Sequence, residues 1–258
     1  MFTLAKWYLD LVTEEGAAVI GYSARLDAGR VRAAYSSVLF SAAGTSAIET
    51  SAFGEAEPPS EEDALVTWRH PALDVRGQWQ RLAAPITRRL LHMPDGDLQW
   101  NCVMPRAWAR VDLAGTRHVG VGYVEHLTLS LPPWKLPFNI LRWGRHTSLA
   151  CSIVWIDWRG KDERRFIWHD GRLQPNAVLS KDGISGLSSG AELVIGEHRD
   201  VCARPALARL TDRLPGAVRP IVRPVAAIFE RKMVAPSSVI APGGSADNGW
   251  SLFEEVQW

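Results

Sequence analysis

Hydrophobic and polar residues alternate with a period of two along most of this chain, which is typical of strands with one buried face. Residues 18–25 (AVIGYSAR) and 31–40 (VRAAYSSVLF) alternate on either side of Asp27-Ala28-Gly29, and this arrangement predicts a hairpin. Further short strands are expected at 45–53, 65–69, 75–82, 97–103, 107–113, 119–129, 148–158, 164–169, 172–179, 192–198, 226–234 and 250–258. So many short strands predict a barrel or a sandwich.

Two proline-containing segments interrupt the alternation. The segment 131–137 (LPPWKLP) is not expected to form a central strand, because prolines lack the N–H that an inner strand must donate. We place a domain junction there, between an N-terminal barrel of residues 1–130 and a C-terminal barrel of residues 131–258. Met104-Pro105-Arg106 is expected to form a tight corner between two strands.

Helix is expected in one region. Leucines at 207, 210 and 214 recur at helical spacing within residues 203–224, where several prolines confine the helix to short pieces. The predicted fold class is therefore all-β, with antiparallel strands and one short helical segment.

The charge and the hydropathy of the chain exclude some classes of partner. With 29 Lys and Arg against 28 Asp and Glu, nothing favours a nucleic acid or an anionic membrane surface. No stretch reaches the roughly 18–20 apolar residues that span a bilayer, and no secretory signal is evident. We therefore expect a cytoplasmic protein without a transmembrane segment; peripheral membrane contact and the oligomeric state stay open.

The cysteines and histidines do not form a recognisable site. Cys102, Cys151 and Cys202 are odd in number and far apart, which fits a reducing compartment, and Cys151 is expected to be inert in an apolar strand. The seven histidines show no H-x-H or H-E-x-x-H spacing and no cysteine partners nearby, so no metal is expected. Gly120-Val121-Gly122 lacks the third glycine of a dinucleotide site. No cofactor is expected.

One acidic residue interrupts an otherwise apolar strand. Glu125 lies in GVGYVEHLTL (120–129), and burying a carboxylate is costly unless it has a partner or a function. Alternation places Tyr123 on the same face as Glu125 and His126 on the other. Desolvation among apolar neighbours would raise the pKa of Glu125 and keep a carboxylic acid protonated near neutral pH. Glu125 is therefore the candidate catalytic acid, with Tyr123 either a hydrogen-bond donor or a packing residue.

Two arginines are possible ion-pair partners for Glu125. An ion pair between Glu125 and Arg142 or Arg145 would lower the pKa of the carboxyl and make it a poor acid. The same two arginines are candidates for binding a substrate carboxylate or phosphate by paired hydrogen bonds, or for holding the two barrels together.

Aromatic residues are the second notable group, with 12 tryptophans in the chain. The faces of Trp100, Trp134 and Trp143 are candidates for stabilising a developing cation on a substrate. Trp7 is a further candidate for substrate binding, and Asp10 beside it is either a second catalytic acid or a structural residue.

Several short motifs resemble one family. Lys6-Trp7-Tyr8-Leu9-Asp10 is similar to the W-Y-F-D opening of the two-domain lipocalin-like family that contains carotenoid 1,2-hydratase and the AttH-like proteins. The family's middle and closing motifs are matched by Trp100…Pro105-Arg106-Ala107, Gly120-Val121-Gly122-Tyr123-Val124-Glu125, Leu141-Arg142-Trp143-Gly144-Arg145 and Gly249-Trp250…Glu255-Val256-Gln257-Trp258. The resemblance spans most of the chain through scattered motifs.

The chain departs from the family at one motif. The hydratase has an aspartate where Glu125 stands, and the asparagine and glycine expected shortly after it are replaced by His126, Leu127 and Thr128. This departure argues against carotenoid hydration itself. The wider superfamily resembles tocopherol cyclases and lipocalin-like Diels–Alderases, which share an apolar cavity between two barrels.

The resemblance implies two lipocalin-like antiparallel barrels with a ligand cavity at or between their mouths. It implies a cofactor-independent enzyme that acts on a hydrophobic polyene or isoprenoid-like substrate by proton-initiated hydration, isomerisation or cyclisation. One alternative is a pericyclase in which Tyr123 and Arg145 preorganise the substrate without proton transfer. Another is a carrier of lipids or other hydrophobic ligands that performs no chemistry.

Overall fold

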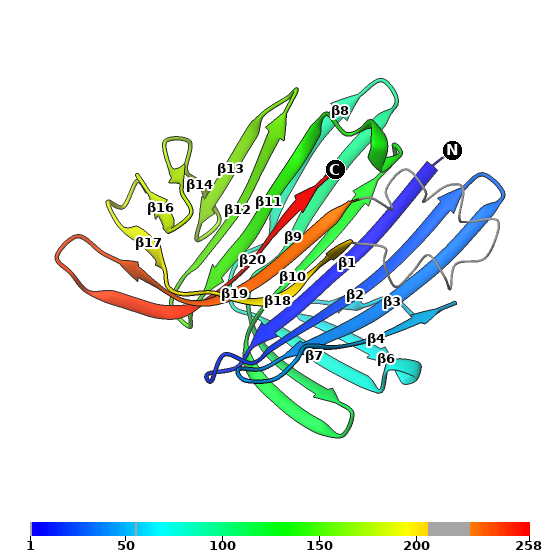
Figure 1. The fold of residues 1–258 in the computed structure, drawn as a ribbon, viewed down its shortest axis with the longest axis horizontal. Coiled ribbons are helices and arrows are strands. Elements are labelled where there is room, and N and C mark those ends of the chain that lie inside the picture. Colours follow the sequence, from blue (N-terminus) through cyan, green and yellow to red (C-terminus); the bar gives the residue numbers. More distant parts are fainter. Residues whose placement is uncertain (1, 55, 206–227) are drawn as a thin grey trace. The chain divides into compact units, whose positions relative to one another are not determined.

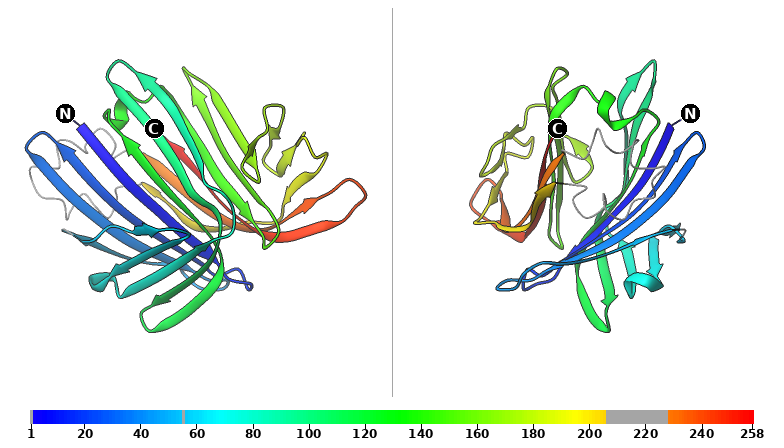
Figure 2. Two further views of the ribbon diagram at one scale, coloured as in Figure 1. Left: turned by 180° about the vertical axis from the view of Figure 1, so that it is seen from behind. Right: turned by 45° about the vertical axis from the view of Figure 1, so that its right-hand side comes forward.

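The structure is a computed structural model that describes residues 2–54, 56–205 and 228–258 (Figure 1). The chain forms two compact units, which divide between Lys135 and Leu136. Each unit is built on one ten-stranded antiparallel sheet that twists and curls (Figures 1 and 2). The all-β fold class is therefore confirmed.

The first sheet has the strand order β4-β3-β2-β1-β10-β9-β7-β6-β5, and β8 pairs with β9. Its strands are β1 (Phe2–Val12), β2 (Ala18–Ala28), β3 (Val31–Ser41), β4 (Ile48–Phe53), β5 (Ser60–Glu62), β6 (Leu65–His70), β7 (Val75–Arg81), β8 (Ile86–Met93), β9 (Gly96–Leu113) and β10 (Thr116–Leu129). Two 3-10 turns, η1 (Pro71–Leu73) and η2 (Pro133–Lys135), belong to the same unit.

The second sheet has the strand order β14-β13-β12-β11-β20-β19-β17-β16-β15, and β18 pairs with β19. Its strands are β11 (Phe138–Thr147), β12 (Ser152–Gly160), β13 (Arg164–His169), β14 (Arg172–Leu173), β15 (Val178–Leu179), β16 (Gly183–Ser185), β17 (Glu192–Ile195), β18 (Arg199–Pro205), β19 (Phe229–Ile240) and β20 (Ala246–Gln257). In both sheets the first strand pairs with the last, β1 with β10 and β11 with β20.

The alternation in the sequence separates the two faces of the first sheet. On β1, Leu9 and Leu11 belong to a buried apolar cluster with Val19, Trp68 and Trp79 from other strands. Successive side chains of a strand point to opposite faces, so Tyr8 and Asp10 lie on the other face of β1. This second face is also buried, since Tyr8 is 2% and Asp10 0% exposed.

The hairpin predicted around Asp27-Ala28-Gly29 is confirmed, with β2 and β3 paired along their full lengths. Gly29 occupies the turn with a φ of +68°, a conformation that glycine adopts at little cost. The proline segment 131–137 is not a strand, as predicted, and contains the 3-10 turn η2.

The tight corner predicted at Met104-Pro105-Arg106 is wrong. β9 continues through these residues and absorbs them as a bulge, because Gly122 pairs with Ala107 while Val124 pairs with Met104. A bulge suits proline, whose missing N–H would leave a gap in a regular ladder. A second shift in register follows directly, between Val124 and Glu125.

The predicted helix at 203–224 lies outside the described residues from position 206 onward, and its first residues, Ala203–Pro205, end strand β18 instead. Strands β8 and β11 had not been predicted from the alternation. In β8 the adjacent Leu90 and Leu91 are both buried beside a register shift, so the strand has no period of two. Among the described residues, none of the helices has the length and apolar character needed to cross a membrane.

Candidate functional site

Glu125 lies in the middle of β10 on the buried second face of the first sheet, with 6% of its surface exposed. One carboxylate oxygen, Oε2, accepts two hydrogen bonds. The indole Nε1 of Trp100 donates one at 2.6 Å, and the phenol of Tyr123 donates the other at 2.7 Å. The predicted pairing of Glu125 and Tyr123 on one face is therefore confirmed, and Trp100 joins them from β9.

The strand register brings three more polar or aromatic side chains to this face. Cys102 on β9 pairs with Glu125, and on β1 Tyr8 pairs with Glu125 and Asp10 with Tyr123. Cys102 and Asp10 have no exposed surface. We call the set Tyr8, Asp10, Trp100, Cys102, Tyr123 and Glu125 the Glu125 cluster.

Burial determines the protonation of two members of the cluster. It raises the pKa of the Tyr123 phenol well above its usual value, and the neighbouring Cys102 and Glu125 raise it further. Burial also raises the pKa of the Cys102 thiol, although a hydrogen bond with Tyr123 opposes the shift. Tyr123 is therefore a neutral donor at pH 7, and Cys102 is a thiol rather than a nucleophilic thiolate.

Aromatic rings surround the acid. Tyr8 meets Tyr123 edge to face at 6.0 Å between ring centroids, and it meets Tyr22 of β2 in the same way at 5.2 Å. The ammonium group of Lys6 lies 4.9 Å from the centroid of the Tyr22 ring. Tyr8 was not among the predicted site residues. It lies two positions before Asp10 on β1, so alternation alone could have placed it on the same face.

The hydrogen bonds of Glu125 define what its carboxyl group can do. An indole N–H only donates, so Oε2 must be the accepting oxygen, and a proton on the acid form is carried by Oε1. When Oε1 gives up its proton, the two donors stabilise the carboxylate that remains.

Two of the predicted substrate-binding residues do not join the cluster. Trp7 lies on the opposite face of β1 from Asp10 and packs against the apolar cluster, with its ring centroid 4.6 Å from that of the tilted His126 ring. Trp134 lies in η2, is 42% exposed and meets Phe2 edge to face. Trp7 packs inside its unit and Trp134 lies at one end of β1, so both lie apart from the carboxyl group of Glu125.

The remaining predicted residues belong to the second unit. Arg145 is fully buried on β11 and donates hydrogen bonds to the hydroxyl of Thr147 and the carbonyl of Trp250. Arg142 and Trp143 line a hollow of about 230 Å³ whose apolar walls include Trp155.

Two glutamates of β20, Glu254 and Glu255, also line this hollow. β20 lies between β11 and β19, so it is an inner strand and not an edge. Glu255 accepts a hydrogen bond from Nε of Arg142 at 2.9 Å, and Glu254 pairs with the buried Lys232 at 2.8 Å. Each acid therefore has its own cationic partner.

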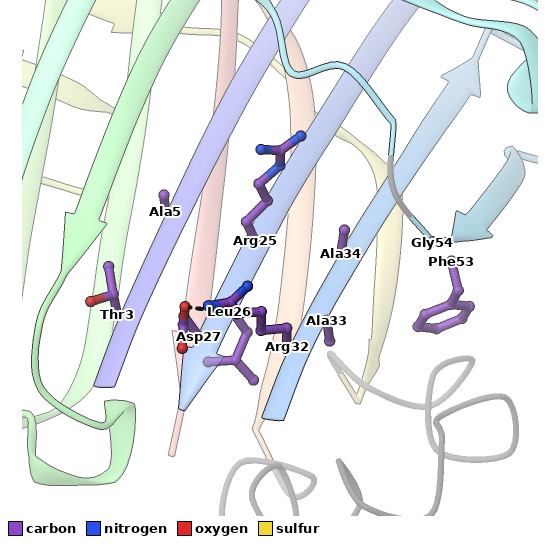
Figure 3. Close-up of a pocket in the computed structure, with 10 residues that line it drawn as sticks. All are labelled: Thr3, Ala5, Arg25, Leu26, Asp27, Arg32, Ala33, Ala34, Phe53 and Gly54. Atoms are coloured by element: carbon purple, nitrogen blue, oxygen red, sulfur yellow. Dashed lines mark ion pairs between the residues drawn. The ribbon is translucent and has the colours of Figure 1, made fainter. Parts of the chain in front are cut away.

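A second hollow, of about 430 Å³, lies in the first unit (Figure 3). Its lining is Thr3, Ala5, Arg25, Leu26, Asp27, Arg32, Ala33, Ala34, Phe53 and Gly54, which includes none of the predicted site residues. Arg32 and Asp27 form an ion pair at 3.4 Å beside it. The lining includes small side chains on the two strands that flank β2, Ala5 on β1 and Ala34 on β3.

Among the described residues, one group of ligand-type side chains lies close enough to hold a metal ion: His146, Cys151 and Asp247. The prediction that no histidine has a cysteine partner nearby is therefore wrong. Cys151 follows His146 closely in the sequence, and the pairing of β11 with β20 brings Asp247 to them.

Replacing Trp100 with phenylalanine is expected to destabilise the protein by about 2–4 kcal/mol, because a buried carboxylate loses a donor and a small void opens. The measurement is the free energy of unfolding in urea. Trp134→Phe, at an exposed position, is the control and should change stability by less than about 0.5 kcal/mol. Equal effects of the two changes would contradict the assigned hydrogen bond.

The thiol of Cys102 is expected to make the protein sensitive to alkali. The pKa of this thiol is higher in the folded than in the unfolded chain. Its contribution to the free energy of unfolding is therefore complete below pH 9 and is lost as the pH rises. Above pH 9, this group lowers the free energy of unfolding by about 1.4 kcal/mol per pH unit. Urea titrations at pH 8 to 10 should therefore show a shallower decline in Cys102→Ala; an unchanged slope would contradict the assignment.

Comparisons with known proteins identify the fold. No known family and no curated protein matches the sequence. Among solved structures, the chain is similar to CghA (TM-score 0.60, 12% identity, covering 99% of this chain and 88% of CghA). It is similar to a protein described as an AttH from Nitrosomonas europaea (TM-score 0.58, 12% identity, 98% and 92%) and to kievitone hydratase from Nectria haematococca (TM-score 0.51, 11% identity, 98% and 88%). These similarities confirm the two-domain lipocalin-like fold that the sequence motifs implied.

Proposed function

We propose that this chain is a cofactor-independent enzyme that acts on an apolar, unsaturated small molecule, with Glu125 as the proton donor. The observation that carries the proposal is the arrangement at Glu125, whose buried carboxyl has two neutral donors on one oxygen. A solved structure of similar fold is named as a hydratase, which supports the same class of chemistry.

In the proposed reaction, Glu125 Oε1 gives its proton to one carbon of an alkene. The π electrons form the new C–H bond, and the other carbon becomes a carbocation. Water then adds and returns a proton to Glu125, which is hydration. Loss of a neighbouring proton instead gives isomerisation. Attack by a second π bond or a hydroxyl group, followed by loss of a proton to the Glu125 carboxylate, gives cyclisation.

The aromatic members of the Glu125 cluster support the cationic step. The rings of Tyr8, Tyr123 and Trp100 lie beside the carboxyl, and a ring face stabilises a nearby cation by about 0.5–2 kcal/mol. Asp10 is proposed to assist as a second acidic group of the same face. In the second unit, Arg142, Trp143 and Arg145 are proposed to bind a small molecule, and the first two line a hollow of that unit.

A pericyclase remains the second candidate, favoured by the Tyr123 phenol, which burial keeps in its hydrogen-bond-donating form. A carrier of hydrophobic ligands is the third. All three functions place an apolar molecule near buried aromatic residues, and they differ in whether a proton reaches carbon.

The test is a reaction in D₂O with squalene, lycopene and a prenylated phenol, followed by mass spectrometry. Proton-initiated chemistry leaves a C–D bond in the product. A pericyclase, tested with a linear triene, gives a cyclised product without deuterium, and a carrier returns its ligand unchanged. Cyclisation without deuterium, or binding without turnover across the panel, would overturn the proposed acid chemistry.

A further inference from the structure

His146 of the second unit has an unusual environment. It lies on β11 with no exposed surface, facing the interior of the curled sheet beside Ile153 of the apolar cluster. Its Nδ1 is 2.7 Å from the hydroxyl oxygen of Ser237, which also accepts a hydrogen bond from Ser251 at 2.8 Å. Its Nε2 is buried and has no hydrogen-bond partner among the described residues.

Two further ligand-type side chains face His146. A ring nitrogen of His146, the sulfur of Cys151 and a carboxylate oxygen of Asp247 lie within 4.8 Å of one another. His146 and Cys151 are buried, and Asp247 is partly exposed. Because Ser237 holds Nδ1, Nε2 is the nitrogen that is available to a bound ion.

A purely structural role does not account for this cluster. Buried polar atoms in folded proteins are nearly always hydrogen-bonded, and an unpaired ring nitrogen beside a thiol and a carboxylate lacks that compensation. A nucleophilic role for the thiol is also disfavoured. Burial, together with the hydrogen bond to Asp247, raises the pKa of Cys151 to about 12, so the free thiol is unreactive at neutral pH.

We propose that His146, Cys151 and Asp247 form a binding site for a divalent cation of the Zn²⁺ type. Imidazole, thiolate and carboxylate are the three side-chain ligands that Zn²⁺ uses in proteins. A thiolate and a carboxylate together carry two negative charges, which balance the charge of the ion. Three protein ligands leave a fourth position for water or another donor, and the partial exposure of Asp247 provides a route of entry.

The groups around the ligands match those of a metal centre. A zinc-bound histidine usually donates its other N–H to an oxygen, as Nδ1 of His146 can to Ser237. The ligating carboxylate is usually hydrogen-bonded as well, and Oδ2 of Asp247 accepts a hydrogen bond from Ser148. The hydroxyl oxygen of Ser148 also accepts the backbone N–H of Cys151 at 2.9 Å, which fixes the position of the thiol.

Binding requires two adjustments. Ligand atoms around tetrahedral zinc are about 3.5 Å apart, so the three side chains, whose ligand atoms lie within 4.8 Å of one another, must close by at most roughly an ångström. The Cys151 thiol must lose its proton, which passes to solvent as the sulfur–metal bond forms. Zinc uptake should therefore release about one proton from the thiol and should weaken as the pH falls.

The experiment uses the full untagged chain, stripped with a chelator and titrated with ZnCl₂ by calorimetry and with CoCl₂ by absorbance. One equivalent of zinc is expected, with a melting temperature that rises with zinc concentration. Tetrahedral Co²⁺ should give visible d–d bands and a near-ultraviolet thiolate charge-transfer band. Cys151→Ser should remove that band and weaken zinc binding by roughly 100-fold or more. Ser237→Ala should weaken it by about 10–100-fold.

Cys202→Ser is the matched control, because Cys202 is the other cysteine of the second unit and lies outside the cluster. It should bind zinc as the wild type does. If His146→Gln fails to fold, as judged by circular dichroism, Cys151→Ser decides the question because it is nearly isosteric. The proposal is overturned if the wild type binds less than one equivalent, if Co²⁺ gives no thiolate band, or if Cys151→Ser binds as tightly as the wild type.

Discussion

Glu125→Gln is expected to lower turnover by about 10²–10⁴-fold, which is the usual contribution of a general acid. The amide keeps the shape of the side chain and can still accept the hydrogen bonds from Trp100 and Tyr123 through its oxygen. It has no proton to give to carbon. The measurement is deuterium incorporation in D₂O with a substrate that the wild-type protein converts, together with the affinity for that substrate.

An acid catalyst and a pericyclase give different outcomes for this change. For an acid catalyst, turnover falls while substrate affinity and melting temperature stay close to those of the wild type. Tyr123→Phe keeps the acid but removes one hydrogen-bond donor from its conjugate base, so turnover is expected to fall by a smaller factor of about 10–100. For a pericyclase, Glu125→Gln should cost less than about tenfold, and that result would reject the acid. Glu192→Gln, at an exposed site on β17, is the matched control.

Local alternation was enough to predict the fold class and part of the site. Two features follow directly from the alternation of nearby residues. They are the hairpin of β2 and β3 and the common face of Tyr123 and Glu125. The same alternation places Trp7 on the opposite face of β1 from Asp10, where it packs against the apolar cluster.

Features that depend on pairing between distant strands could not be predicted in the same way. The bulge at Pro105 and Arg106 exists because β9 carries extra residues opposite Tyr123, and the sequence of β9 alone resembles a corner. Asp247 meets His146 only because the last strand of the second sheet pairs with the first. The residues on one strand do not reveal which residues of a distant strand will lie opposite them, because packing across the whole sheet sets the register.

Gly122→Ala adds a single methyl group and is expected to lower the free energy of unfolding by about 3–5 kcal/mol. A glycine within a strand often marks a bend or a close approach to the backbone. The structure shows the close approach, because an added Cβ would lie 2.2 Å from the carbonyl oxygen of Asp10 and 3.0 Å from Cβ of Ala109. A backbone oxygen in the middle of a sheet cannot move aside as a flexible side chain can.

The carbonyl of Asp10 also accepts a hydrogen bond from the indole of Trp79 at 2.7 Å, so the added methyl group would disturb a second buried contact. Urea unfolding at pH 7 measures the loss. The control is Gly29→Ala, where nothing lies within 4 Å of the added Cβ and only the φ of +68° opposes a side chain, at about 1–2 kcal/mol. If both variants lost the same small amount, β1 and β10 would not be as close at Gly122 as the structure has them. Because Gly122 directly precedes Tyr123, that result would also question the placement of the Glu125 cluster.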